Sequence, residues 1–185
     1  MPKYVMVIDQ RRCIGCMACV VSCKTENDVS PEHFRTRVVQ EVRGIFPKLR
    51  MELRSELCNH CDNPPCVTNC PTGASYKNEE NGMVLLKRYR CVGCKACLAA
   101  CPYDARFIHP QDGYADKCTF CAHRVAAGME PACVKTCIGK SRIFGDAEDP
   151  ESEVSRILRE THSEVLKPGA GTRPRVYYIY RHLKG

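Results

Sequence analysis

The chain of 185 residues carries a formal charge of +7, has no tryptophan and devotes 16 residues to cysteine. So many cysteines exclude an ordinary apolar core and require that disulfides, zinc or iron–sulfur clusters occupy the sulfurs. No stretch approaches the roughly 18 apolar residues of a membrane span, so the sequence predicts no direct insertion into a bilayer. The basic excess alone would fit a nucleic-acid ligand, an interpretation that depends on what the sulfurs hold.

The first predicted elements are strands. Residues 4–8 are a short apolar run, which predicts that residues 3–8 form a strand entering the first cysteine loop. Residues 49–53 alternate apolar and charged side chains. This alternation predicts a half-buried strand, paired with residues 38–42 through a turn at 44–47. Six basic residues face two glutamates between residues 35 and 54, so this segment is either a solvated surface or a docking face.

Later in the chain, the Asn81-Gly82 pair favours positive φ and predicts a tight turn before a strand at residues 83–87. The Asp149-Pro150 pair predicts the start of a helix, because aspartate caps free amides and proline fits the first turn. We expect this helix to run to about residue 167. Residues 172–185 are basic and aromatic, and we expect them to form a strand or arm that packs on a partner subunit.

The cysteines fall into four runs of four, and the first and third runs have the C-x2-C-x2-C-x3-C spacing of bacterial iron–sulfur proteins. These two runs are Cys13, Cys16, Cys19 and Cys23, and Cys91, Cys94, Cys97 and Cys101. Three thiolates at this spacing wrap one cubane, while the fourth lies beyond the next turn and ligates the other cluster of a pair. Segments 12–23 and 90–101 match at Arg, Gly, Ala and all four Cys, which indicates a duplicated two-cluster module.

The second and fourth runs are loosened versions of the same pattern. They are Cys58, Cys61, Cys66 and Cys70, and Cys118, Cys121, Cys133 and Cys137. Insertions between the second and third cysteines lengthen these loops without changing which sulfurs can reach a cubane. The four complete quartets therefore predict four [4Fe-4S] clusters.

Zinc and disulfides fit this pattern poorly. A structural zinc site usually joins two C-x2-C pairs rather than runs of three, and disulfides need Cα separations that most of these close pairs do not supply. Four oxidised clusters with their thiolates carry about −8, which brings the holoprotein to about −1 and removes most of the case for nucleic-acid binding.

The chain closely resembles the four-cluster iron–sulfur subunits of the dimethyl sulfoxide reductase family of molybdopterin oxidoreductases, especially those of polysulfide and thiosulfate reductases. The likeness covers nearly the whole chain. It rests on the segments MVIDQRRCIGCMACVVSCKTEN, CNHCDNPPCVTNCPTGASY, CVGCKACLAACPYDARFIHP, KCTFCAHR, FGDAEDPES and GTRP.

The resemblance implies which cysteines share a cluster. One lobe would hold two clusters, on Cys13, Cys16, Cys19 and Cys137, and on Cys23, Cys118, Cys121 and Cys133. The other lobe would hold two more, on Cys58, Cys61, Cys66 and Cys101, and on Cys70, Cys91, Cys94 and Cys97. Lys24 and Ile138 stand where the ferredoxin pattern has proline after the fourth cysteine, so the loops of the first lobe depart from that pattern.

The fold implied is α+β, with two interleaved bacterial-ferredoxin-like lobes, small β-hairpin insertions and a C-terminal helix and arm. The first lobe would be discontinuous, comprising residues 1–57 and 113–150. The second would comprise residues 58–112, and the C-terminal helix and basic arm residues 151–185.

The function implied is a non-catalytic relay of electrons between a quinone-binding membrane subunit and a molybdopterin catalytic subunit. Such a peripheral, membrane-associated complex would be a heterotrimer or a dimer of heterotrimers, on the periplasmic face in preference to the cytoplasmic one. The alternatives are a free-standing polyferredoxin shuttle and a nucleic-acid-binding zinc protein. His60 is expected to donate a hydrogen bond that tunes a cluster, and His109 and His123 to be surface or packing residues.

Overall fold

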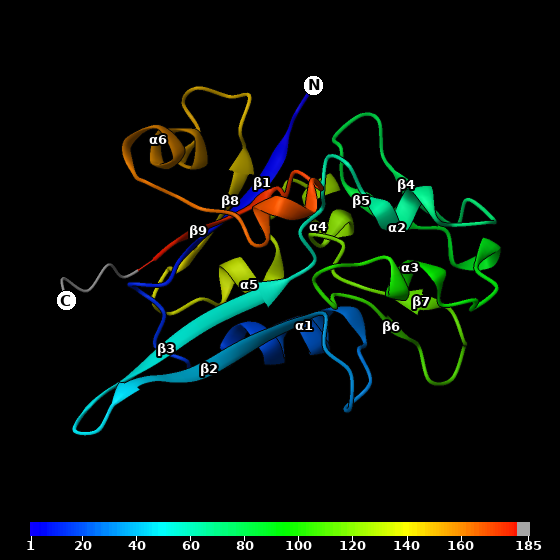
Figure 1. The fold of residues 1–185 in the computed structure, drawn as a ribbon. Helices are drawn as coiled ribbons and strands as arrows, with labels where there is room; N and C mark the ends of the chain where they lie inside the picture. Colours follow the sequence, from blue (N-terminus) through cyan, green and yellow to red (C-terminus); the bar gives the residue numbers. More distant parts are fainter. Residues whose placement is uncertain (181–185) are drawn as a thin grey trace.

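The computed structural model describes residues 1–180, which form two halves joined side by side (Figure 1). A three-stranded sheet organises the first half. Its central strand β1 (Tyr4–Asp9) pairs antiparallel with β8 (Arg142–Asp146) and parallel with β9 (Val176–Ile179). The middle of β1 is completely buried, as expected of an apolar strand covered on both faces. The strand predicted at residues 3–8 is therefore confirmed, and it leads directly into the first cysteine loop.

Helices cover this sheet on both sides. Helix α1 (Ala18–Asn27) packs against α5 (Ala132–Lys135), and α6 (Glu153–Glu160) packs on β8 and β1. Val154, Ile157 and Leu158 of α6 contact the apolar face formed by Val5 and Val7. Burial of this apolar stripe is the main stabilisation of such a short helix.

The predicted bounds of α6 are wrong at both ends. The N-cap is Ser152, whose Oγ accepts a hydrogen bond from the amide of Ser155 at 3.2 Å. Asp149 instead accepts from the amide of Glu151 in the preceding turn. The helix ends at Glu160 because Glu164 pairs with Tyr178 through two main-chain hydrogen bonds, which draws the chain back to the sheet.

The C-terminal segment packs on its own chain rather than projecting as an arm. Strand β9 lies beside β1, and Tyr178 is completely buried in the core. The strand alternative of the prediction is therefore confirmed as β9, whereas the expected packing on a partner subunit is wrong as far as residue 180, because this strand packs on the chain's own sheet. The remaining part of the predicted segment, residues 181–185, lies outside the described residues.

A long two-stranded ribbon extends away from the first half (Figure 1). Strand β2 (Thr36–Ile45) pairs antiparallel with β3 (Lys48–Leu57), so the predicted pairing is confirmed, although the turn is only Phe46-Pro47. The expectation of half-burial holds only at the base. Towards the tip, Leu49 and Met51 are 53% and 62% exposed, because none of residues 1–180 covers that part of the apolar face.

The opposite face of the ribbon carries a ladder of ion pairs. Arg54 contacts Glu41 and Glu56, and Arg43 contacts Glu41 and Glu52, at 2.6–3.2 Å. Two of the six basic residues of this segment are thus paired with glutamates on the same strand and on the neighbouring one.

The second half consists of short elements around loops. They are α2 (Pro65–Thr68), β4 (Ser75–Lys77), β5 (Val84–Leu86), η1 (Arg88–Arg90), α3 (Ala96–Ala99), β6 (Phe107–Ile108) and β7 (Ala115–Asp116). Helix α4 (Ala122–Ala126) follows where the chain returns to the first half, and η2 (Pro168–Ala170) follows α6. The predicted strand at 83–87 is confirmed as β5, and the turn before it contains Gly82 at φ +68°. Among residues 1–180, no helix is long and apolar enough to cross a bilayer.

Candidate metal centres

Two equivalent loops carry the regular cysteine runs. In the first loop, Gly15 and Met17 have positive φ of 71° and 60°, and in the third, Gly93 and Lys95 have 66° and 64°. Left-handed residues at these alternate positions bend the backbone so that successive cysteines point into one space. Gly93 is also sterically required, since a Cβ there would lie 2.6 Å from the carbonyl oxygen of Gly113.

Three enclosed cavities are each lined by four cysteines from two different runs. The first has Cys13, Cys16, Cys19 and Cys137; the second has Cys23, Cys118, Cys121 and Cys133; the third has Cys58, Cys61, Cys66 and Cys101. In every case the fourth cysteine of one run crosses to the cysteines of another. Helix α1 makes this possible in the first half, because Cys19 and Cys23 lie on it one turn apart, beside α5.

The remaining cysteines are Cys70, Cys91, Cys94 and Cys97. Burial raises the pKa of the Cys97 thiol, and the charges of Cys91 and Cys70 raise it further. These three cysteines therefore lie close together. Cys94 is exposed at the rim of the same loop. None of the sixteen cysteines forms a disulfide. Within the described residues, no three Cys, His, Asp or Glu side chains converge on a single-ion site.

Main-chain amides point at several of these sulfurs. The donor and acceptor pairs are Ser75 and Cys70 (3.3 Å), Ala115 and Cys91 (3.3 Å), Ser141 and Cys137 (3.2 Å), and Phe120 and Cys118 (3.4 Å). Such donors stabilise a thiolate and oppose the effect of burial. At Cys70 the combined effect of the hydrogen-bond donors exceeds that of burial, so the pKa of this thiol is lowered.

Without a metal, the charged thiolate form of the buried cysteines is electrostatically unfavourable. Burial, followed by the charges of Cys133 and Cys121, raises the pKa of Cys23 to about 12. Burial likewise raises the pKa of Cys61 to about 12, and that of Cys118 well above its ordinary value. Four thiolates that repel one another in an apolar cavity, with amides aimed at their sulfurs, are a donor set suited to a cationic iron core.

His60 takes a different position from the one expected. Its Nδ1 accepts the amide hydrogen of Val84 at 3.1 Å, so its Nε2 carries the proton and donates to the carbonyl of Cys118 at 3.1 Å. Both ring nitrogens therefore form hydrogen bonds with main-chain groups. His109 stacks on Tyr114, and the exposed His123 pairs with Glu26, as a packing and a surface residue respectively.

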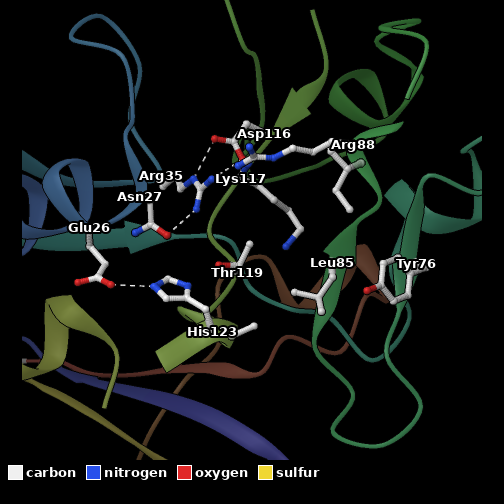
Figure 2. Close-up of a pocket in the computed structure, with 12 residues that line it drawn as sticks. Glu26, Asn27, Arg35, Tyr76, Leu85, Arg88, Asp116, Lys117, Thr119 and His123 are labelled. Carbon is white, nitrogen blue, oxygen red and sulfur yellow. Dashed lines mark hydrogen bonds and ion pairs between the residues drawn. The ribbon is translucent and has the colours of Figure 1, made fainter. Parts of the chain in front are cut away.

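A larger cavity, of about 460 Å³, has no cysteine in its lining (Figure 2). Figure 2 shows that several of its polar side chains pair with one another: Arg35 binds Asp116 and Asn27, and Glu26 binds His123. Lys117, which is almost fully buried, donates to the carbonyls of Val84 and Cys118. This cavity adjoins that of the second quartet, since Asn27, Arg35 and Thr119 line both.

Sequence reasoning missed two buried arginines, Arg106 and Arg142, that lie against the thiols. Arg106 lines the cavity of Cys58 and its partners, and Arg142 lines the cavity of Cys13 and its partners. A signal was present in the spacing, since each arginine follows the last cysteine of its run, Cys101 or Cys137, by five residues.

Two models of the 4Fe-4S dicluster domain match the chain, one over residues 49–147 and the other over residues 12–74. The chain belongs to the 4Fe-4S dicluster family. The expected α+β architecture with two dicluster regions is therefore confirmed, as is the expectation of four [4Fe-4S] clusters on sixteen cysteines.

Relatives within this dicluster family are named as reductase subunits. A tetrathionate reductase subunit of Salmonella typhimurium is 49% identical over 181 residues, 96% of this chain and 72% of that protein. The thiosulfate reductase electron transfer subunit PhsB of Salmonella typhi is 48% identical over 164 residues, 83% and 80% of the two chains. The arsenate respiratory reductase iron-sulfur subunit ArrB of a Shewanella species is 35% identical over 222 residues, 94% of each chain. The expected role, an electron-transfer rather than a catalytic subunit of such reductase complexes, is confirmed.

Proposed function

We propose that four [4Fe-4S] clusters are held by crossed quartets, in the combinations that the family resemblance implies. The observation that carries this proposal is the lining of the three cavities, each with three cysteines of one run and one of another. The fourth quartet follows from the proximity of Cys70, Cys91 and Cys97, with Cys94 in the same loop. Each cluster would take up and release one electron.

The quartets form a linear series. Cys19 of the first quartet lies near Cys133 of the second, and Cys118 of the second lies near Cys58 of the third. Cys66 of the third and Cys97 of the fourth both contact Arg106. Neighbouring clusters would therefore be close enough to exchange electrons, and the chain would transfer electrons from one terminal cluster to the other.

The two ends of this series reach the surface. Cys16 in the first quartet and Cys94 in the fourth are exposed, whereas the second quartet is completely buried. The apolar residues beside the two exposed cysteines, Ile14 and Val92, are 64% and 68% exposed. Apolar rims around the terminal clusters are suited to contact with other proteins.

We infer that one end faces a molybdopterin catalytic subunit and the other a quinone-binding membrane subunit, in a complex of the thiosulfate or tetrathionate reductase type. The printed names of the relatives support a place in a reductase complex. The outer face of the membrane is the location that the family resemblance favours.

We further propose two lobes, residues 1–57 with 113–150 and residues 58–112. The pairing of β1 with β8 and the packing of α1 on α5 support the discontinuous lobe, and the packing of α2 on α3 supports the second. The C-terminal unit, residues 151–185, is not separate as far as residue 180, because β9 joins the sheet of the first lobe.

Two measurements test this function. Anaerobically purified protein should contain about sixteen iron and sixteen sulfide per chain; about four zinc without sulfide would refute the proposal. Native purification should bring a large pterin-containing protein with the chain. Elution of a fully loaded chain alone would favour the alternative of a free polyferredoxin, and a steep loss of nucleic-acid affinity with salt would favour a nucleic-acid ligand.

A further inference from the structure

Arg106 is a buried cation that contacts sulfur in the second lobe. Its side chain is 5% exposed, and its Nη2 donates to the Sγ of Cys66 at 3.0 Å and to the Oγ of Ser75 at 2.7 Å. The charge of the guanidinium acts on Cys58 and Cys66 of one quartet and on Cys97 of the other. No carboxylate within the described part of the chain forms an ion pair with it, and its Nη1 has no hydrogen-bond partner there.

Arg142 occupies the corresponding place in the first lobe. It is 3% exposed, and its Nη2 donates to the hydroxyls of Thr36 and Ser55. Its charge acts on Cys19 of one quartet and on Cys133 of the next. Its Nε and Nη1 have no hydrogen-bond partner among residues 1–180, and none of the ion pairs formed there includes it.

The other buried arginines, unlike these two, form ion pairs with carboxylates. Arg35 is paired with Asp116, and Arg175 with Asp62. A buried charge without a counter-ion is strongly unfavourable, so the partners of Arg106 and Arg142 must be the thiolates and the clusters they hold. One such arginine stands in each lobe, five residues after Cys101 of the third run and five after Cys137 of the fourth, which makes a single accidental burial an inadequate explanation.

We propose that Arg106 and Arg142 are positioning residues, each of which raises the reduction potential of the two clusters in its own lobe. The proposal rests on the crossed quartets described above. Reduction adds one electron to a cluster, with no bond made or broken, so the reduced form carries one more negative charge. A fixed guanidinium beside the sulfurs stabilises the reduced form more than the oxidised one, and net charge is a recognised determinant of cluster potential. Since arginine stays protonated, the effect should be independent of pH.

The test is a redox titration of the anaerobically purified chain, monitored by electron paramagnetic resonance, after iron has been counted. Arg106→Met should lower the reduction potentials of two of the four clusters by at least about 59 mV, which corresponds to a tenfold change in the equilibrium constant of one-electron reduction. Arg142→Met should lower the other two. The matched control is Arg175→Met, which removes a buried arginine from Asp62 while Lys77 still pairs with that carboxylate, and all four potentials should stay unchanged.

Fully loaded Met variants with four unaltered potentials, or with all four shifted equally, would overturn the proposal. If a Met variant loses iron, the Lys and Gln variants test the proposal instead. Provided that they retain all four clusters, Arg106→Lys should keep the native potentials and Arg106→Gln should lower two of them. Failure of every variant to assemble clusters would also overturn it, in favour of a purely structural arginine. A wild-type chain short of iron would instead refute the four-cluster function itself, so the two failures are distinguishable.

Discussion

The imidazole of His60 joins the two halves of the molecule, because its Nε2 donates to the carbonyl of Cys118 across the boundary between them. The ring also stacks on Phe120 with 3.7 Å between the ring centroids. Complete burial, followed by the nearby charge of Lys117, lowers the pKa of His60 well below its usual range. His60 is therefore a neutral ring that uses both nitrogens to hold the second and third quartets in a fixed relationship.

Replacing His60 by phenylalanine should destabilise the protein while preserving the stack on Phe120. The amide of Val84 would lose its partner, and a stranded buried group costs about 1–3 kcal/mol, whereas the carbonyl of Cys118 would keep the hydrogen bond from Lys117. We expect a lower urea midpoint for loss of the cluster absorbance. The control is His123→Phe at an exposed position, which should leave the midpoint nearly unchanged; equal midpoints for the two variants would contradict this account.

Gly139→Ala should prevent assembly of one cluster. A Cβ at Gly139 would overlap the main-chain carbonyl oxygen of Arg12, which precedes Cys13. The Cys13 loop would have to move away from Cys137, and we expect a loss of about four iron per chain. Gly169→Ala is the matched control, since its Cβ would meet nothing within 4 Å. Full iron content in Gly139→Ala would show that the close approach is dispensable.

Buried and exposed ion pairs should differ sharply in their effect on stability. Arg35 binds Asp116 through two hydrogen bonds of 2.9 and 2.8 Å, with both side chains buried. Asp116→Asn should cost about 3–5 kcal/mol, because a buried guanidinium loses its counter-ion. Arg50→Ala on the exposed face of the ribbon should cost about 0–1 kcal/mol. Thermal unfolding of the holoprotein distinguishes them, and comparable melting temperatures for the two variants would be inconsistent with the structure.

The cysteine loops were the most predictable part of the molecule. Spacing alone indicates which three thiols of a regular run share a space, and the internal repeat indicates a second copy of the same unit. Strands β1 and β5 were also predictable, because each is an apolar run bounded by turn or loop residues. The buried arginines were not singled out, since a charged residue in a sequence shows its burial only when its partners are known.

The errors concern segments whose structure depends on distant residues. Local sequence favours a helix from Asp149, but Ser152 supplies the N-cap and the pairing of Glu164 with Tyr178 ends the helix early. The alternation in β3 correctly predicted a strand with one apolar face. It did not indicate that the tip near Met51 is exposed in the described part of the chain, because alternation reports which face is apolar and not what packs on it.

The crossed coordination of the first lobe is tested most directly by comparing serine variants of Cys137, Cys16 and Cys133 by electron paramagnetic resonance of the reduced protein. Cys137 and Cys133 lie four residues apart in one run, yet they line different cavities. Cys137→Ser should alter the same cluster signal as Cys16→Ser and leave intact the signal that Cys133→Ser alters. If Cys137→Ser and Cys133→Ser alter one and the same signal, while that of Cys16→Ser is separate, the crossed assignment is contradicted.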